Sequence, residues 1–246
     1  MALVTGNGLS NNITPSSASA GVSGWYGGLW GDDTIDGGAG ADDMNGGDGN
    51  DTYHVDNVGD IVREDWDDVS GGTADTVLAT VTYSIGPGTF RNQGHGIENL
   101  TLMGSANINA TGNSKNNILN GNSGNNVLNG GAGNDKLFGG AGNDSINGGD
   151  GVDTLIGGDG NDTLTGGAGA DKFRFNSLSE KVDTIQDFFR TQGDKIEVSK
   201  SGFGATSLSQ ISYNAGSGSL SFLGTEFAKI ANLPAGFAVS LDVVLI

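Results

Sequence analysis

One apolar residue in every nine is the dominant hydrophobic pattern of this chain. Residues 112–174 divide without a break into seven nonapeptides, and residues 28–54 divide into three more. A helix face needs three or four apolar residues per two turns, so this spacing excludes helices. It predicts very short strands with one inward side chain each, stacked in parallel so that these side chains form a stripe. The apolar residues at place eight are Ile35, Met44, Tyr53, Leu119, Leu128, Leu137, Ile146, Leu155, Leu164 and Phe173.

The polar part of each unit predicts a turn. Units such as GGAGNDKLF and GGDGNDTLT keep glycine at places one, two and four. Glycine adopts positive φ and lets two backbones approach closely. We therefore expect tight glycine-rich turns between the short strands, in an all-β fold.

Outside the two tracts the nine-residue period is lost. Residues 55–111 alternate apolar and polar positions, for example at Val77, Ala79, Val81 and Tyr83, which predicts a strand in a β-rich continuation with wider turns. Within this segment, residues 86–96 are expected to form a projecting loop. Because the ends of a stacked fold expose apolar rungs, we expect residues 1–27 and 175–246 to be caps, the latter rich in β-structure.

Composition narrows the function classes. The chain has 46 glycines, no cysteine and a formal net charge of −18, with only 11 lysine and arginine residues. So few basic residues argue against a nucleic-acid partner. Disulfides are excluded, and no apolar run is long enough for a transmembrane segment.

Aspartate at place six is the candidate chemistry. One such aspartate is usually a turn residue that bonds its own backbone. A stack of them, spaced about 4.8 Å apart, would repel strongly unless cations lay between the turns. Carboxylate and carbonyl oxygens without imidazole or thiolate favour calcium over magnesium. The aspartates are Asp33, Asp42, Asp51, Asp135, Asp144, Asp153, Asp162 and Asp171.

The units resemble the GGxGxDxUx repeat of the RTX, or haemolysin-type calcium-binding, proteins of bacteria. The resemblance implies a parallel β-roll, a right-handed β-solenoid in which two nonapeptides make one turn and several calcium ions lie between turns 18 residues apart. It pairs turns on each side of the roll. On one side, the turn at 148–153 pairs with those at 130–135 and 166–171; on the opposite side, the turn at 139–144 pairs with that at 157–162. In the short tract, the turn at 28–33 pairs with that at 46–51. Besides the eight aspartates, it assigns as ligands Gly131, Gly133, Gly140, Gly142, Gly148, Asp150, Gly157, Asp159, Gly166 and Ala168.

Some positions depart from the repeat. The turn from Gly28 begins Gly-Leu-Trp, and asparagine replaces aspartate at Asn117 and Asn126. The asparagine turns are weaker sites or ion-free rungs whose amides bond along the stack. Three acids beyond the repeats, Asp183, Asp187 and Asp194, are interpreted as solvated loop residues, with a further calcium site as the alternative.

The final residues, SLDVVLI, resemble the acidic-then-apolar tail of proteins exported by type I secretion. A terminal edge strand would have the same pattern. Together with the repeats, the tail indicates a secreted, extracellular protein that is exported by the type I machinery.

No catalytic constellation is found. The two histidines, His54 and His95, belong to no zinc motif. Aromatic residues near the N-terminus are expected to pack in a core or cap, with a glycan-binding surface as the alternative; they are Trp25, Tyr26, Trp30 and Trp66. The sequence thus favours a non-enzymatic calcium-binding protein that folds on export. The alternatives are the export and folding module of a larger secreted enzyme or toxin, such as a protease, lipase or alginate epimerase, and a calcium-dependent cell-surface or glycan-binding protein.

Overall fold

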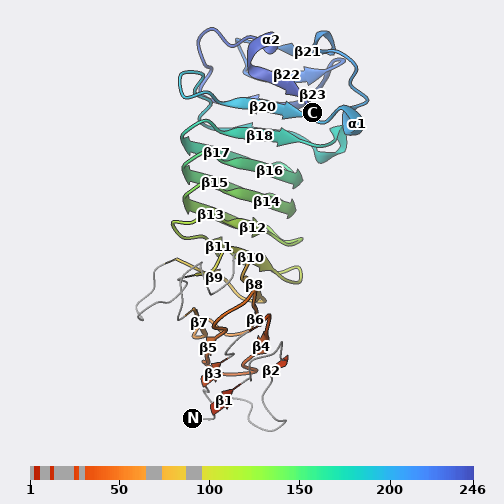
Figure 1. Ribbon diagram of the computed structural model, residues 1–246. Coiled ribbons are helices and arrows are strands. Elements are labelled where there is room, and N and C mark those ends of the chain that lie inside the picture. The colour runs from red at the N-terminus through yellow and green to blue at the C-terminus, as the bar shows by residue number, and fades with distance from the viewer. Residues whose placement is uncertain (1–2, 6–11, 14–24, 28–30, 65–73, 87–95) are drawn as a thin grey trace. The chain divides into compact units, whose positions relative to one another are not determined.

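The computed structural model describes residues 3–5, 12–13, 25–27, 31–64, 74–86 and 96–246 (Figure 1). Two compact units make up the chain. The first comprises Met1–Gly104 and Ile108–Ile118, and the second comprises Ser105–Asn107 and Leu119–Ile246.

Successive strands of the first unit alternate between two parallel sheets. One sheet has the order β1-β3-β5-β7, and the other includes β2-β4-β6-β8-β10. A further parallel pair joins β9 and β11. Two strands therefore make one turn, which confirms a parallel β-roll here. The strands are β1 (Leu3–Thr5), β2 (Asn12–Ile13), β3 (Trp25–Gly27), β4 (Thr34–Asp36), β5 (Asp43–Asn45), β6 (Thr52–Val55), β7 (Ile61–Arg63), β8 (Thr76–Ala79), β9 (Tyr83–Ser84), β10 (Asn99–Leu102) and β11 (Ala110–Thr111).

Successive strands of the second unit also alternate between two sheets. Their orders are β12-β14-β16-β18-β20-β24 and β13-β15-β17-β19-β23-β22-β21, and only the last two pairings of the second order are antiparallel. The strands are β12 (Ile118–Asn120), β13 (Val127–Ala132), β14 (Lys136–Ala141), β15 (Ser145–Asp150), β16 (Thr154–Asp159), β17 (Thr163–Ala168), β18 (Lys172–Phe175), β19 (Asp183–Ile185), β20 (Lys195–Val198), β21 (Ile211–Tyr213), β22 (Ser219–Phe222), β23 (Thr225–Ile230) and β24 (Val243–Leu245). The helices are α1 (Lys200–Phe203), α2 (Val239–Asp242) and the 3-10 turns η1 (Leu178–Glu180) and η2 (Leu208–Gln210).

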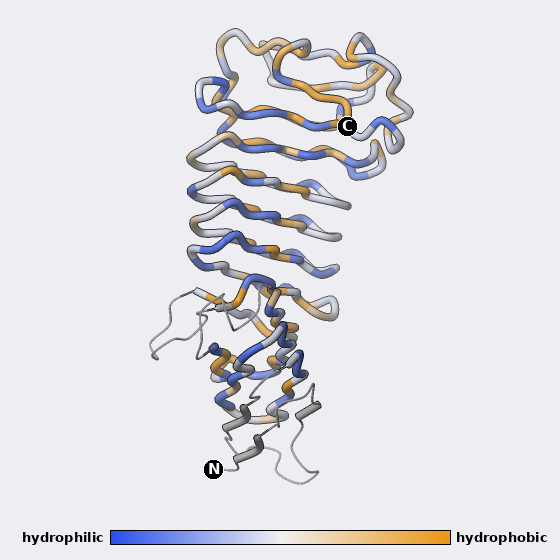
Figure 2. The backbone as a smooth tube through the Cα atoms, viewed as in Figure 1, coloured by the Kyte–Doolittle hydropathy of each residue, from blue (hydrophilic) through white to orange (hydrophobic). Residues whose placement is uncertain are grey.

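The residues at place eight form the core of both units, as the pattern predicts. All ten are at most 1% exposed. Leu128 pairs with Ile146 and Ile146 with Leu164, each 18 residues further on, while Leu137, Leu155 and Phe173 form the matching stripe in the other sheet. The regular return of apolar segments in the stacked strands of the second unit is visible in Figure 2.

The glycines at places two and four adopt the conformation that the turn requires. Gly149 has a φ of 110° and Gly151 a φ of 144°, in the left-handed region that only glycine enters readily. A Cβ at either position would also overlap a backbone carbonyl of the preceding turn. Both the backbone conformation and the close approach of the preceding turn therefore require glycine at places two and four.

The alternating segment from Val77 to Tyr83 is not one strand. It splits into β8 and β9, which lie in different sheets, and the chain turns between them. The N–H of Thr80 donates to the carbonyl of Val55, whereas the N–H of Tyr83 donates to that of Asn109. Most of the predicted N-terminal cap and residues 87–95 of the predicted loop lie outside the described residues.

An aromatic cluster covers the last apolar rung of the repeats. The ring of Phe173 lies 6.2 Å from that of Phe188, which lies 5.4 Å from Phe237. Phe175 packs edge-on against Phe227 of β23 at 5.2 Å. This is the packing expected of a β-rich C-terminal cap. Within the described residues, no helix has both the length and the apolar character needed to cross a membrane.

Candidate metal centre

The place-six aspartates form ladders in which each rung contacts the next. The N–H of Asp135 donates to Asp153 Oδ1 at 2.8 Å, and the N–H of Asp153 donates to Asp171 Oδ1 at 3.0 Å. In the other sheet, the N–H of Asp144 donates to Asp162 Oδ1 at 2.7 Å. Parallel strands in 18-residue register place these groups in line, as the pairing of turns predicts. All eight predicted aspartates are at most 3% exposed.

One carboxylate oxygen of three ladder residues is buried and accepts no hydrogen bond from the described residues. This holds for Oδ2 of Asp144, Asp153 and Asp171. Each Oδ2 lies over the place-one glycine of its own turn, for example Asp153 Oδ2 over Gly148, where a Cβ would overlap it. A buried carboxylate oxygen without a partner is costly, so the ladder is suited to a cation.

Backbone carbonyls line the same turns. The carbonyl oxygens of Gly131 and Gly133 point at Gly149 and Gly151 of the next turn, and those of Gly140 and Gly142 point at the turn that starts at Gly157. Place-one carbonyls, those of Gly148, Gly157 and Gly166, approach the place-one glycine of the preceding turn. The predicted glycine ligands therefore lie between successive turns.

The place-three residues behave differently. The carbonyls of Asp150, Asp159 and Ala168 accept hydrogen bonds from Gly133, Gly142 and Gly151 of the preceding turn at 2.7–2.9 Å. Their side chains are exposed. These three carbonyls already accept backbone hydrogen bonds between successive turns, and the side chains of Asp150 and Asp159 are exposed to solvent.

Electrostatics oppose charge on the ladder. Burial raises the pKa of Asp144 to about 6. The charge of Asp162 adds to this rise, and a hydrogen bond from a backbone N–H partly offsets it. Burial also raises the pKa of Asp171 to about 6, with Asp194 and Asp153 adding to the rise. The pKa of Asp153 is raised for the same reason. A hard divalent cation would favour the ionised form, and an all-oxygen donor set is what calcium takes.

The two asparagine rungs are satisfied within the protein. Asn117 Oδ1 accepts the N–H of Asn113 at 2.8 Å, and Asn126 Oδ1 accepts the N–H of Asn122 at 2.9 Å. The amide of Asn117 also donates to the Glu98 carbonyl of a neighbouring rung. Both oxygens are engaged, which fits the interpretation of these rungs as ion-free.

The ladders extend beyond the repeats, which the sequence reasoning missed. Asp60, Asp75, Glu98, Asp183 and Asp194 accept, through one carboxylate oxygen, the N–H of Asp42, Asp51, Asp75, Asp162 and Asp171 respectively. Each acid lies at the start of a strand or directly before it, and an apolar residue follows two positions later. The five segments are DIV, DTV, ENL, DTI and DKI. Places six to eight of the repeat have the same pattern of acid, any residue and apolar residue. This three-residue pattern could therefore have identified the five acids even though the nine-residue period is lost there.

The interpretation of Asp183 and Asp194 as solvated loop acids is wrong. They are 2% and 1% exposed because β19 and β20 pair with β17 and β18 and place both acids on the ladders. Asp187 is half-buried and accepts the N–H groups of Gly166 and Gly167 at 2.8 and 2.9 Å.

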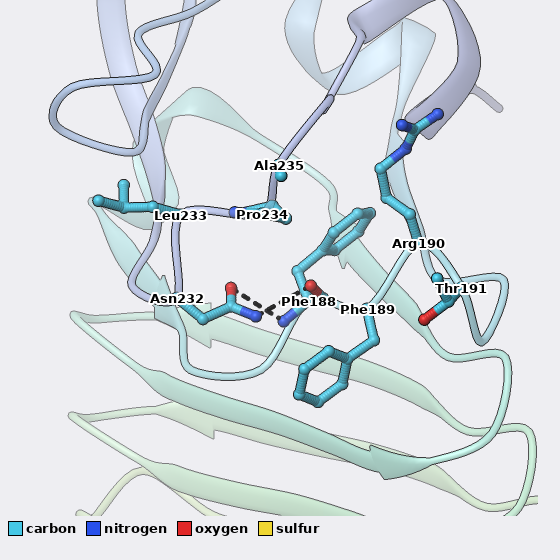
Figure 3. Close-up of a pocket in the computed structure, with 8 residues that line it drawn as sticks. All are labelled: Phe188, Phe189, Arg190, Thr191, Asn232, Leu233, Pro234 and Ala235. Carbon is cyan, nitrogen blue, oxygen red and sulfur yellow. Dashed lines mark hydrogen bonds between the residues drawn. The ribbon is translucent and has the colours of Figure 1, made fainter.

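A surface pocket of about 300 Å³ lies in the C-terminal segment, between residues 188–191 and 232–235 (Figure 3). Its polar groups bond to one another: Asn232 accepts the N–H of Phe188 and donates to the Phe188 carbonyl. Arg190, on its rim, is held by Asp242 at 2.9 Å.

The remaining predictions concern histidines and aromatic residues. His54 is exposed on β6, as expected for place nine. His95, Trp30, Trp66 and the turn from Gly28 to Trp30 lie outside the described residues, as do the side chains of Trp25 and Tyr26. Their predicted roles stay predictions.

Comparison with known proteins agrees with this geometry. The family model described as "RTX calcium-binding nonapeptide repeat (4 copies)" matches residues 28–61, 111–146 and 147–177. No curated protein matches the chain. The matched segments contain all of the predicted metal ligands.

Proposed function

We propose that this chain, whose nonapeptides belong to the RTX calcium-binding repeat family, is a secreted protein that folds as a β-roll when calcium binds outside the cell. One observation carries the proposal. The Oδ2 atoms of three ladder residues, Asp144, Asp153 and Asp171, are buried and accept no hydrogen bond from the described residues. A fold with that feature needs cations to be stable at neutral pH.

Ligand linkage supplies the mechanism. An ion that binds only the folded chain adds RT ln(1 + [Ca²⁺]/Kd) to its stability, about 2.7 kcal/mol at a calcium concentration 100 times Kd. Several ions would offset the ordering cost of 46 glycines, while the net charge of −18 opposes collapse of the metal-free chain. Sites with Kd on the order of 10⁻⁴ to 10⁻³ M would remain empty in the cytosol and fill outside.

Calcium binding is tested by isothermal titration of the metal-stripped full chain, with magnesium as the control. We expect several calcium ions per chain and much weaker binding of magnesium. A chain that takes up no calcium at millimolar concentration would contradict the proposal.

Export is a separate part of the proposal. RTX repeat proteins are generally secreted, and the resemblance of the repeats to that family implies the type I route. The chain should reach the medium of a bacterial host only when a type I exporter is co-expressed. Equal release without the exporter would contradict this route.

We further propose that this chain has no enzymatic activity of its own. His54 is exposed on a strand, and the residues around the described cap pocket are engaged in structural bonds. The buried acids lie in ladders suited to ion binding.

A further inference from the structure

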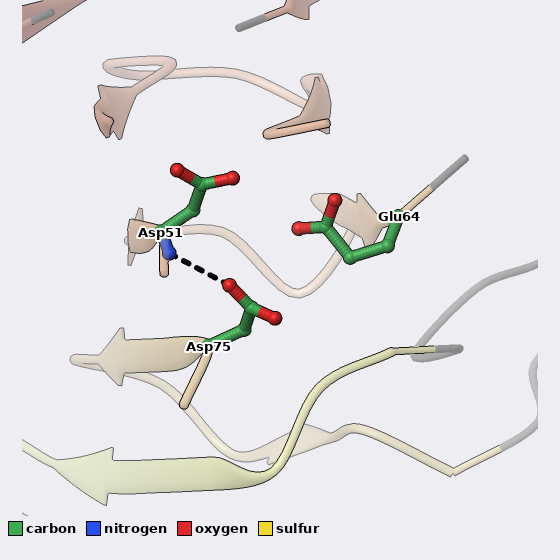
Figure 4. A group of neighbouring side chains, drawn as sticks. All are labelled: Asp51, Glu64 and Asp75. Atoms are coloured by element: carbon green, nitrogen blue, oxygen red, sulfur yellow. Dashed lines mark hydrogen bonds between the residues drawn. The ribbon is translucent and has the colours of Figure 1, made fainter. Parts of the chain in front are cut away.

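A group of three buried carboxyls lies where the first repeat tract ends. Asp51 is the last place-six aspartate of that tract, whereas Glu64 and Asp75 come from outside the repeats. One carboxylate oxygen from each lies within 4.8 Å of the others, and all three residues are 1% exposed. Figure 4 shows the three side chains, from three separate segments, turned toward a common space. We call Asp51, Glu64 and Asp75 the carboxylate trio.

Register explains how non-repeat residues reach this place. Thr52 pairs with Thr76, so Asp75 takes the rung after Asp51 although 24 residues separate them. Asn45 pairs with Arg63, so Glu64 stands on the rung after Gly46, the first glycine of its repeat. A carboxylate thus occupies the position where a further repeat would have glycine.

Hydrogen bonds hold the trio but leave oxygens unsatisfied. Glu64 Oε2 accepts the N–H of Gly47 at 2.8 Å, and Glu64 Oε1 accepts the hydroxyl of Tyr53, which itself accepts the N–H of Gly46. Asp75 Oδ1 accepts the N–H of Asp51 at 2.7 Å. Oδ2 of Asp51 and Oδ2 of Asp75 are buried and accept no hydrogen bond from the described residues. Two unpartnered buried oxygens beside a third carboxylate indicate a missing positive charge.

The basic side chains described in the first unit do not supply that charge. In the described part of the first unit, the basic residues are Arg63 and Lys115. Arg63 pairs with Asp43 at 2.8 Å and Lys115 with Glu98 at 3.1 Å. Burial raises the pKa of Glu64 to about 9 and that of Asp75 to about 8, so three negative charges are unfavourable here without a compensating ion.

We propose that the carboxylate trio binds one divalent cation, calcium, at the end of the first tract. Two oxygens on one calcium ion lie at most about 5 Å apart, twice the ordinary calcium–oxygen distance, and the trio meets that limit. Tyr53 is a positioning residue, since its hydroxyl donates a hydrogen bond to Glu64 Oε1. The proposal rests on the proposed function only in the choice of calcium, because two of the three carboxylates, those of Glu64 and Asp75, come from outside the repeats.

The test counts ions bound by the full chain. Equilibrium dialysis at saturating calcium compares the wild type with Glu64→Gln, which keeps the size of the side chain and removes its charge. Glu226→Gln, at an exposed glutamate, is the control for the same change in net charge. Glu64→Gln should bind one ion fewer than both other proteins; an unchanged count overturns the proposal.

A second variant guards against misfolding of the first. Asp75→Asn retains an acceptor for the N–H of Asp51 and should also lose one ion, with far-UV circular dichroism reporting the fold. The double variant should lose no more than one, because both residues serve one site; a loss of two overturns the proposal. Asp153→Asn separates this test from that of the proposed function, since it removes a repeat ligand and leaves the trio intact. If Asp153→Asn has no effect while Glu64→Gln loses an ion, the repeat proposal fails and the trio stands.

Discussion

Glycine at place one of the repeat is required for a reason other than backbone conformation. Gly148 does not have the positive φ of Gly149 and Gly151. The space above it is filled by Asp153 Oδ2 and by the carbonyl of Gly166, 2.6 Å from where a Cβ would lie. Place one is therefore glycine because the ladder carboxylate lies there.

This contact predicts that adding one methyl group at Gly148 weakens calcium-dependent folding. Gly148→Ala should raise the calcium concentration at the folding midpoint by about tenfold, equivalent to about 1.4 kcal/mol, because the Cβ displaces Asp153 Oδ2. Gly216→Ala is the matched control, since the nearest atom to its Cβ is 3.4 Å away. Titration followed by circular dichroism measures both; coincident midpoints would show that the displaced oxygen plays no part in binding.

Strands that carry the ladders outside the repeats were only partly predictable. The nine-residue period predicted every rung of the long tract, because an apolar residue recurs at place eight and aspartate or asparagine at place six. The rungs at Asp183 and Asp194 follow their predecessors by 21 and 23 residues, and so lose that period. Turn residues such as those of η1 lengthen the spacing without changing the strand register.

The side-chain cluster at the end of the first tract could not be predicted from the sequence either. Glu64 meets Asp51 only because β7 pairs with β5 and β8 pairs with β6, which is a matter of sheet register. Likewise, the sequence indicated a β-rich cap but not the antiparallel pairing of β21, β22 and β23. Such pairings depend on packing between distant segments, which local pattern does not record.

The ladder beyond the repeats has its own test. Asp183→Asn should weaken calcium binding because it removes a buried charge while leaving an acceptor for the N–H of Asp162. Asp56→Asn, at an exposed acid, removes the same charge at the surface and should leave binding unchanged. Calorimetric titration measures the calcium affinity of the two variants. Equal affinities would show that the ladder residues outside the repeats do not contribute to calcium binding.

For the whole molecule, the raised pKa values predict that acid partly replaces calcium. The folded-state pKa of Asp144 and Asp171 is raised to about 6 and that of Asp51 to about 7, so the metal-free fold holds more protons than the unfolded chain between about pH 4 and pH 7. Stability of the metal-free fold therefore falls as the pH rises through this window, and calcium dependence grows.

Circular dichroism of the metal-stripped chain at pH 5 and pH 8 measures this effect. We expect more β-structure at pH 5, and calcium should add most at pH 8. A metal-free chain whose spectrum is the same at both values would contradict the assignment of these acids to desolvated ladders.

The central claim is that cations complete the β-roll. Far-UV circular dichroism of the chelated full chain at neutral pH, titrated with calcium and separately with magnesium, tests it most directly. We expect a disordered spectrum that becomes β cooperatively with calcium and not with magnesium. A β spectrum that persists after complete removal of metal, with no bound calcium remaining, would show that the buried ladders are stable without ions and that cations are not needed for the β-roll.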